Sequence, residues 1–238
     1  MCKTFLLGWP LMLAITLAMN PPQWEISRRL PPERSWEEQI AAVRAGDEVW
    51  IVVERTPITD RHVADLSGLT GLTALELGQS ELTVEAVAEL ARLPRLDRVI
   101  LRGRAVDDAL FGALCRIPTI RFLNLPDTTI TDDGLVALQE CPDLLQLRFA
   151  SRNVTDAGMP HLASLGRLKS LHLIDVAITD HGLAQLSGLT QLESLYIDGA
   201  QITDTGIERL LKQLPELHFH IDQAHHDRDP RRGTHVHE

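Results

Sequence analysis

Two histidines near the carboxyl end of the chain have the types and spacing of metal ligands. His218 and His220 are two residues apart, and Asp222 follows at the same interval. On a β-strand, alternate side chains point to the same face, so all three would lie together. Imidazole nitrogens and a carboxylate oxygen are ligands that zinc accepts. The pattern is compatible with a zinc site, and with a metal-dependent hydrolase or metal-binding protein built on it.

The same histidines also fit a solvated, histidine-rich end. A polar tail follows them and carries His225, His226, His235 and His237. Neighbouring strands lie about 4.8 Å apart, so His172, two predicted strands away from His220, cannot share a metal with both histidines. We therefore expect no cofactor, and zinc at His218, His220 and Asp222 is the alternative hypothesis.

Arginine and aromatic residues form a second candidate site in the middle of the chain. Such side chains dominate protein–protein interfaces when they cluster. The candidate partner-binding residues are Arg98, Arg102, Phe122, Arg148, His172 and Tyr196. The net charge of the whole chain is -10, so a local positive patch favours a partner with an acidic surface. The alternative is scattered, solvated charge.

Several functional classes are disfavoured by composition and motifs. A net charge of -10 argues against nucleic-acid binding, because attraction to phosphates needs a basic surface. The sequence has no glycine-rich phosphate loop, no G-x-S-x-G nucleophile turn and no H-E-x-x-H pair. We therefore expect a protein that is not an enzyme.

The candidate metal-binding and partner-binding residues belong to a sequence repeat of 24 residues. Stepping by 24 from Leu195 meets an apolar residue at every position, and the same holds two residues later and at the start of each predicted helix. The first column is Ile51, Leu75, Val99, Leu123, Leu147, Leu171, Leu195 and Phe219. The second is Val53, Leu77, Leu101, Leu125, Phe149, Leu173, Ile197 and Ile221. The third is Ile58, Leu82, Val106, Ile130, Val154, Ile178 and Ile202. A period held this long indicates a solenoid of stacked units.

The repeat Leu192-x-x-Leu195-x-Ile197-x-x-Ala200-x-Ile202-Thr-Asp-x-Gly-Ile207 closely resembles the leucine-rich repeat family. Its I-T-D-x-G-L subtype is similar to bacterial repeat proteins and to the repeat regions of F-box proteins. The resemblance covers residues 48–222. It implies an α/β horseshoe like that of ribonuclease inhibitor, with about eight 24-residue coils, a parallel sheet on the concave side and helices on the convex side. It also implies a non-catalytic protein-binding scaffold; a structural envelope protein is a further alternative.

The resemblance places the arginine and aromatic residues on the concave face. Residues between the core positions of each strand point outward. One such column is Val52, Glu76, Ile100, Asn124, Arg148, His172, Tyr196 and His220. Beside it run Trp50, Ala74, Arg98, Phe122, Gln146, Ser170, Ser194 and His218.

A Thr-Asp-x-Gly motif recurs where each helix is expected to begin. The threonines are suited to cap the helix, the aspartates to interact with its positive end, and the glycines to allow close approach of the neighbouring coil. Val84 and Ala86 replace the aspartate and glycine in one coil. The asparagine column of many leucine-rich repeats is missing, so no continuous side-chain ladder is expected along the turns.

Two cysteines fall within the repeats. Cys141 lies in a core column, whereas Cys115 lies two residues earlier in its own coil. Their side chains are therefore expected to point in different directions, which argues against a disulfide.

The segments outside the solenoid have their own patterns. Residues 1–18 carry one lysine and a short apolar run ending in Thr16-Leu-Ala18, typical of a signal peptide. An uncleaved membrane anchor is the alternative, and would be the chain's sole contact with a membrane. Residues 19–32 are a Pro-rich linker, residues 33–47 an N-terminal cap helix with a Ser35/Glu38 capping box, and residues 223–238 the polar tail. We expect an extracytoplasmic protein: periplasmic, secreted or membrane-anchored.

Overall fold

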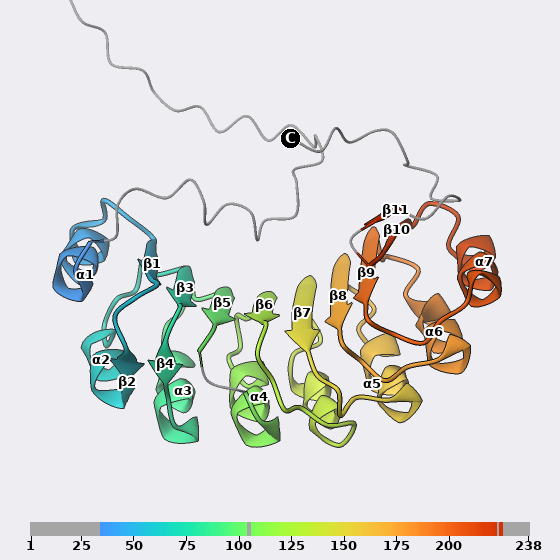
Figure 1. Cartoon of the computed structure of the whole chain (residues 1–238). Helices are drawn as coiled ribbons and strands as arrows, with labels where there is room; N and C mark the ends of the chain where they lie inside the picture. Colours follow the sequence, from blue (N-terminus) through green and yellow to red (C-terminus); the bar gives the residue numbers. More distant parts are fainter. Residues whose placement is uncertain (1–33, 104–105, 223, 226–238) are drawn as a thin grey trace, which may run out of the picture. The chain divides into compact units, whose positions relative to one another are not determined.

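The computed structural model describes residues 34–103, 106–222 and 224–225 (Figure 1). The predicted signal peptide or anchor, the Pro-rich linker and nearly all of the histidine-rich tail lie outside these residues. Within the described part, no helix is both long and apolar enough to cross a membrane.

One sheet runs through the described part, and its strands follow one another in chain order. Eight of them pair in parallel. These strands are β1 (Trp50–Val53), β3 (Ala74–Leu77), β5 (Arg98–Leu101), β6 (Phe122–Leu125), β7 (Gln146–Ala150), β8 (Ser170–Ile174), β9 (Ser194–Asp198) and β10 (His218–Ile221). A small parallel pair, β2 (Ile58–Thr59) and β4 (Ser80–Glu81), lies at the start of the first helices.

The strand register confirms the 24-residue period. Leu171 faces Leu195 and His172 faces Tyr196 across β8 and β9. A one-residue slip would turn every apolar side chain of a strand to the wrong face. The constant period therefore keeps all the core residues on one side of the sheet, and the predicted α/β solenoid is confirmed.

Helices cover the outer, convex side of the curved sheet (Figure 1). They are short because each coil returns to the next strand within 24 residues. The α-helices are α1 (Trp36–Ala45), α2 (Asp60–Asp65), α3 (Val84–Leu90), α4 (Asp108–Cys115), α5 (Met159–Ala163), α6 (Asp180–Gln185) and α7 (Asp204–Gln213). The 3₁₀ segments are η2 (Gly134–Glu140), η3 (Asp156–Gly158) and η4 (Leu186–Gly188). The core lies between sheet and helices, and its leucines, such as Leu147, Leu171 and Leu195, are fully buried.

The Thr-Asp-x-Gly motif links most coils to the next. The Asp156 carboxylate accepts hydrogen bonds from the backbone amide of Thr179, at 2.8 Å, and from its hydroxyl, at 2.6 Å. The same two bonds recur in the pairs Asp60–Thr83, Asp108–Thr131, Asp132–Thr155 and Asp180–Thr203. The hydroxyl and amide of Thr203 lower the pKa of Asp180 below its ordinary value. The coils are therefore joined by a ladder of side-chain hydrogen bonds. The aspartates and threonines of this motif form it, in place of the asparagine column that the sequence lacks.

The glycine of the motif makes room for this aspartate. A Cβ atom at Gly182 would overlap Asp156 Oδ1, and Gly134, Gly158 and Gly206 face the aspartates of their preceding coils in the same way. The predicted close approach is thus an approach of the glycine to a carboxylate. Ala86 stands at the equivalent position of its coil, where Thr83 still bonds to Asp60, so this junction keeps its bond although the residue carries a methyl group.

The ladder is interrupted where the sequence departs from the motif. Val84 replaces the aspartate and offers no acceptor to the following coil. There Asp107 takes the capping position instead, and its Oδ1 accepts from the Leu110 amide at 2.9 Å. Asp108 then resumes the ladder toward Thr131.

Helix α1 covers the first coil. The capping box at Ser35 and Glu38 is present, and Gly46 ends the helix with a φ of 81°. Trp36, Ile40 and Val43 are buried against the solenoid core. This apolar stripe shields the first core layer from water, as expected for a solenoid cap.

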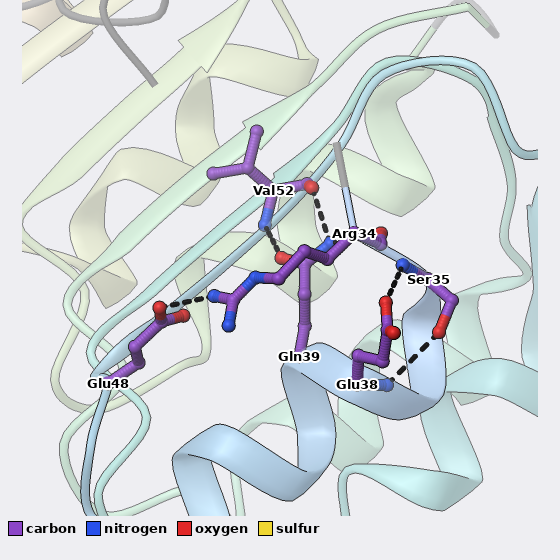
Figure 2. Close-up of polar contacts among 6 residues, drawn as sticks. All are labelled: Arg34, Ser35, Glu38, Gln39, Glu48 and Val52. Carbon is purple, nitrogen blue, oxygen red and sulfur yellow. Dashed lines mark hydrogen bonds and ion pairs between the residues drawn. The ribbon is translucent and has the colours of Figure 1, made fainter. Parts of the chain in front are cut away.

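A side-chain amide pairs with the free edge of β1 (Figure 2). Gln39 Nε2 donates to the Val52 carbonyl at 2.8 Å, and Gln39 Oε1 accepts from the Val52 amide at 2.8 Å. Gln39 Nε2 also donates to the Arg34 carbonyl at 3.0 Å. The amide therefore forms the two bonds that another strand would form, and blocks an edge that could pair with another chain.

A short strand lies against the opposite edge of the sheet. There β11 (Ala224–His225) pairs antiparallel with β10, with Ile221 facing Ala224. The chain can turn back here because Asp222 adopts a φ of 47° at the end of β10.

The two cysteines lie closer than the repeat columns indicated. Both are buried and free of disulfides. A hydrogen bond with Cys141, together with burial, raises the pKa of the Cys115 thiol. The prediction of diverging side chains was wrong because it assumed the same helix geometry in each coil, whereas Cys115 is the last residue of α4 and Cys141 directly follows the 3₁₀ segment η2.

We predict that Gly182→Ala lowers the free energy of unfolding by about 1–2 kcal/mol, because the added methyl group displaces the Asp156 carboxylate. Urea denaturation would measure this loss. Gly188→Ala is the matched control, since no atom lies within 4 Å of its Cβ position. In an Asp156→Ala background the same change at Gly182 should cost much less, because only Met159 Cγ, 3.1 Å from the Cβ position, stays close and alanine favours helix over glycine. An equal cost in both backgrounds would refute this account of the glycine.

We also predict that Gln39→Met destabilises the solenoid by about 1–3 kcal/mol, since it removes both partners of Val52 while keeping side-chain volume. The exposed edge should also promote self-association. Denaturation and analytical ultracentrifugation would measure the two effects. Gln139→Met, at an exposed glutamine of η2, should change neither. Unaltered stability and association of the Gln39 variant would show that the edge needs no such cover.

Candidate partner-binding surface

The parallel strands place both predicted concave columns in register. Val52 faces Glu76 across β1 and β3, and the pairing continues without a shift to Tyr196 and His220 across β9 and β10. The second column runs likewise from Trp50 to His218. The six candidate residues therefore come from neighbouring strands of one face, Arg102 following directly after β5.

This face is more closely packed than the sequence indicates. Glu76, Ile100, Asn124, His218 and His220 are buried. Curvature brings the side chains of neighbouring strands together on the concave side, where they cover one another. Polar residues on this face are consequently held by specific partners.

Arg102 is the candidate arginine with an acidic partner. Its Nη1 lies 2.6 Å from Glu76 Oε1, and the Glu76 side chain is only 10% exposed. The pair is neutral as a whole. Glu76 was not among the candidate residues, although the repeat places it in the same concave column as Arg148, His172 and Tyr196.

Arg98 is held by an aromatic ring. Its guanidinium carbon lies 4.3 Å from the centroid of Phe122, a cation–π contact across β5 and β6. Burial lowers the pKa of Arg98, while the nearby charges of Asp97 and Glu76 act in the opposite direction. Among the described residues, no carboxylate lies within ion-pair distance of Arg98.

Arg148 is held by two neutral side chains. Its Nη1 donates to Asn124 Oδ1 at 3.0 Å, and its Nε donates to His172 Nδ1 at 3.3 Å. Burial and the charge of Arg102 lower the pKa of Arg148, while the nearby charges of Asp198 and Asp127 act in the opposite direction. It too has no ion-pair partner among the residues that the structure describes. The surface therefore holds two fixed, partly buried positive charges that are not matched by direct ion pairs.

His172 connects Arg148 to the end of β9. Its Nε2 lies 2.9 Å from Asp198 Oδ2, and since its Nδ1 accepts from Arg148, Nε2 carries the proton in the neutral ring. Burial and the Arg148 charge lower the pKa of His172, against the opposing effect of Asp198. Asp198 is not among the candidate residues, because its role as the partner of His172 depends on the tertiary structure.

Aromatic rings stack at the carboxyl end of the face. Tyr196 lies between His172, at a centroid distance of 5.3 Å, and His220, at 4.5 Å. His220 Nε2 lies 2.7 Å from His218 Nε2, so one ring donates a hydrogen bond to the other. Tyr196 thus links the arginine region to the two candidate metal ligands.

The three proposed metal ligands do not converge on one point. Asp222 Oδ1 accepts from the Gly199 amide at 2.9 Å, beyond the end of β10. Across the described ranges, no group of three or more His, Cys, Asp or Glu residues could hold a metal ion. The His218–His220 pair supplies two imidazole nitrogens, and zinc binding there remains a hypothesis.

Comparisons with known proteins concern the repeat architecture. A family model described as a leucine rich repeat matches residues 116–138. Among solved structures, an internalin (inlF) from Listeria monocytogenes is similar, with 19% identity and a TM-score of 0.52 over 74% of this chain and 54% of that chain. The chain thus spans about half the length of that internalin. A comparison with curated proteins finds no match. At this identity the likeness extends to the fold alone.

We predict that Arg102→Met lowers the free energy of unfolding by about 1–3 kcal/mol, because it leaves the Glu76 carboxylate without its ion partner. The double variant Glu76→Gln/Arg102→Met should recover most of the loss. Arg92→Met is the matched control, because Arg92 is 78% exposed in its pair with Glu89 and should change stability by less than about 0.5 kcal/mol. Equal losses for Arg102→Met and Arg92→Met, measured by denaturation, would contradict a special role for the Glu76 pair.

Proposed function

We propose that this chain, a leucine-rich repeat protein, is a non-catalytic scaffold that binds an acidic segment of another protein on its concave face. The observation that carries the proposal is the pair Arg98 and Arg148. Each guanidinium group is partly buried and fixed by uncharged neighbours, Phe122 for Arg98 and Asn124 with His172 for Arg148. Charged groups that are drawn out of water favour a nearby opposite charge.

Carboxylates of a partner would supply that charge. A guanidinium group accepts a carboxylate with two parallel hydrogen bonds. The two arginine side chains are already oriented by their contacts on β5 and β7, with β6 between these strands, so little further ordering is needed on binding. Phe122 and Tyr196 add apolar area beside the charges, the combination that carries most binding energy in interfaces.

The repeat subtype and the location are further parts of this proposal. The I-T-D-x-G-L subtype is supported by the Thr–Asp bonds between coils and by the glycine that makes room for each aspartate. An extracytoplasmic location rests on the signal-like pattern of residues 1–18.

The test is direct binding of poly-L-aspartate to the full chain at fixed ionic strength. We expect Arg98→Glu/Arg148→Glu to weaken binding about tenfold or more, equivalent to about 1.4 kcal/mol. The control Arg92→Glu/Arg167→Glu makes the same change in net charge at exposed arginines, 78% and 61% exposed. It should change the affinity less than about twofold.

Affinity capture from cells with the same three proteins would then identify the partner. The expected partner is retained by the wild type and by the control variant, and lost by Arg98→Glu/Arg148→Glu. Equal binding of poly-L-aspartate by both double variants would refute the concave site.

A further inference from the structure

We propose that His172 takes up a proton when an acidic partner engages Arg148, so that the concave face binds more tightly at mildly acidic pH. This inference rests on the function proposed above and adds its regulation. It follows from the position of one imidazole ring between a guanidinium group and a carboxylate.

The hydrogen bonds of His172 define its protonation state. Nδ1 accepts from Arg148 Nε at 3.3 Å, so this nitrogen has its lone pair free. Nε2 donates to Asp198 Oδ2 at 2.9 Å. The ring is therefore neutral, and the site that would receive a second proton already faces an N–H group.

Protonation of Nδ1 conflicts with the bond from Arg148. Two donors would face each other, and two positive charges would lie in contact. Arg148 would have to leave the ring, keeping its bond to Asn124 or turning outward. The imidazolium would remain paired with Asp198. In the free protein burial and this conflict both favour the neutral ring, and burial first, then the Arg148 charge, lower the pKa of His172.

A carboxylate bound to Arg148 removes the conflict. It draws the guanidinium group away from Nδ1, and its negative charge stabilises the imidazolium. Both effects make the ring easier to protonate in the complex than in the free protein. By reciprocity, the protonated protein binds the carboxylate more tightly.

The other groups around His172 do not reverse this effect. From β9, Tyr196 presents an uncharged ring at 5.3 Å and Asp198 a carboxylate that stabilises the imidazolium. From β7 the facing group is Arg148 itself. Arg102, whose charge acts on Arg148, is already paired with Glu76. His220 lies on the far side of Tyr196, stacked on that ring.

The first test compares the affinity of the full chain for poly-L-aspartate at about pH 7.5 and about pH 5.5, at fixed ionic strength. Aspartate has a pKa of about 3.9, so the probe stays ionised at both values. We expect the wild type to bind about fivefold more tightly at the lower pH, within the usual range of coupling between two sites. His172→Gln, which does not titrate at position 172, should lose most of this gain; the other histidines of the chain, present in both proteins, contribute equally to each.

His181→Gln is the control, because His181 is an exposed histidine of α6 and its replacement should leave the pH dependence intact. A pH dependence that is undiminished in His172→Gln, or is absent from the wild type, overturns this inference while the acidic-partner proposal stands. Absence of binding at both pH values overturns the acidic-partner proposal, and this inference with it.

A second test needs no ligand. The ring resonances of His172, followed by NMR against pH in the full chain, report its pKa directly. Arg148→Gln removes the facing positive charge, so we expect the pKa of His172 to rise in this variant, and not in Arg92→Gln. An unchanged pKa in Arg148→Gln would also overturn the inference.

Discussion

Hydrogen bonds from one coil to an aspartate of the preceding coil, which join most neighbouring coils and are missing only after Val84 in the described repeats, are the interaction on which the rest of this structure depends. A single 24-residue coil cannot bury its own leucines, so it is stable only when stacked. Burial of the leucines favours stacking of the coils but does not fix their relative orientation, because the hydrophobic effect is non-directional. The Asp–Thr bonds fix this orientation, because one carboxylate accepts hydrogen bonds from both the amide and the hydroxyl of the threonine in the next coil. Together they set how each coil is placed on its neighbour.

The ends of such a stack pose a separate problem, since each end exposes a core layer and a strand edge. At the amino end, Trp36, Ile40 and Val43 cover the layer, and Gln39 pairs with the edge through its side-chain amide. At the carboxyl end a short antiparallel strand covers part of the last edge. The described chain therefore blocks strand addition at one end with a side chain and at the other with its own backbone.

The concave face inherits its geometry from the stacking. Because the coils are held in register, residues 24 positions apart become neighbours on adjacent strands, and a chain of contacts runs from Asn124 through Arg148 to His172 and Asp198. Neutral groups hold Arg148, which leaves its charge available to a ligand. The imidazole ring of His172, which can bind a proton, lies directly beside Arg148, so the charge bound at Arg148 and the protonation of His172 affect each other.

The sequence by itself determined the repeat, the strand register and the residues of both concave columns, because a strict period with apolar residues at fixed positions permits only one face to be buried. The capping box at Ser35 and Glu38 was also evident, since its two bonds are local. In contrast, the partners of Arg102, Arg148 and His172, the Asp–Thr ladder and the Gln39 edge were decided by the tertiary structure. The cysteine contact belongs to this second group. These contacts join residues more than ten positions apart, and their geometry depends on coil curvature and on whether each helix is α or 3₁₀. A linear pattern states which residues share a face, but not which side chains meet there.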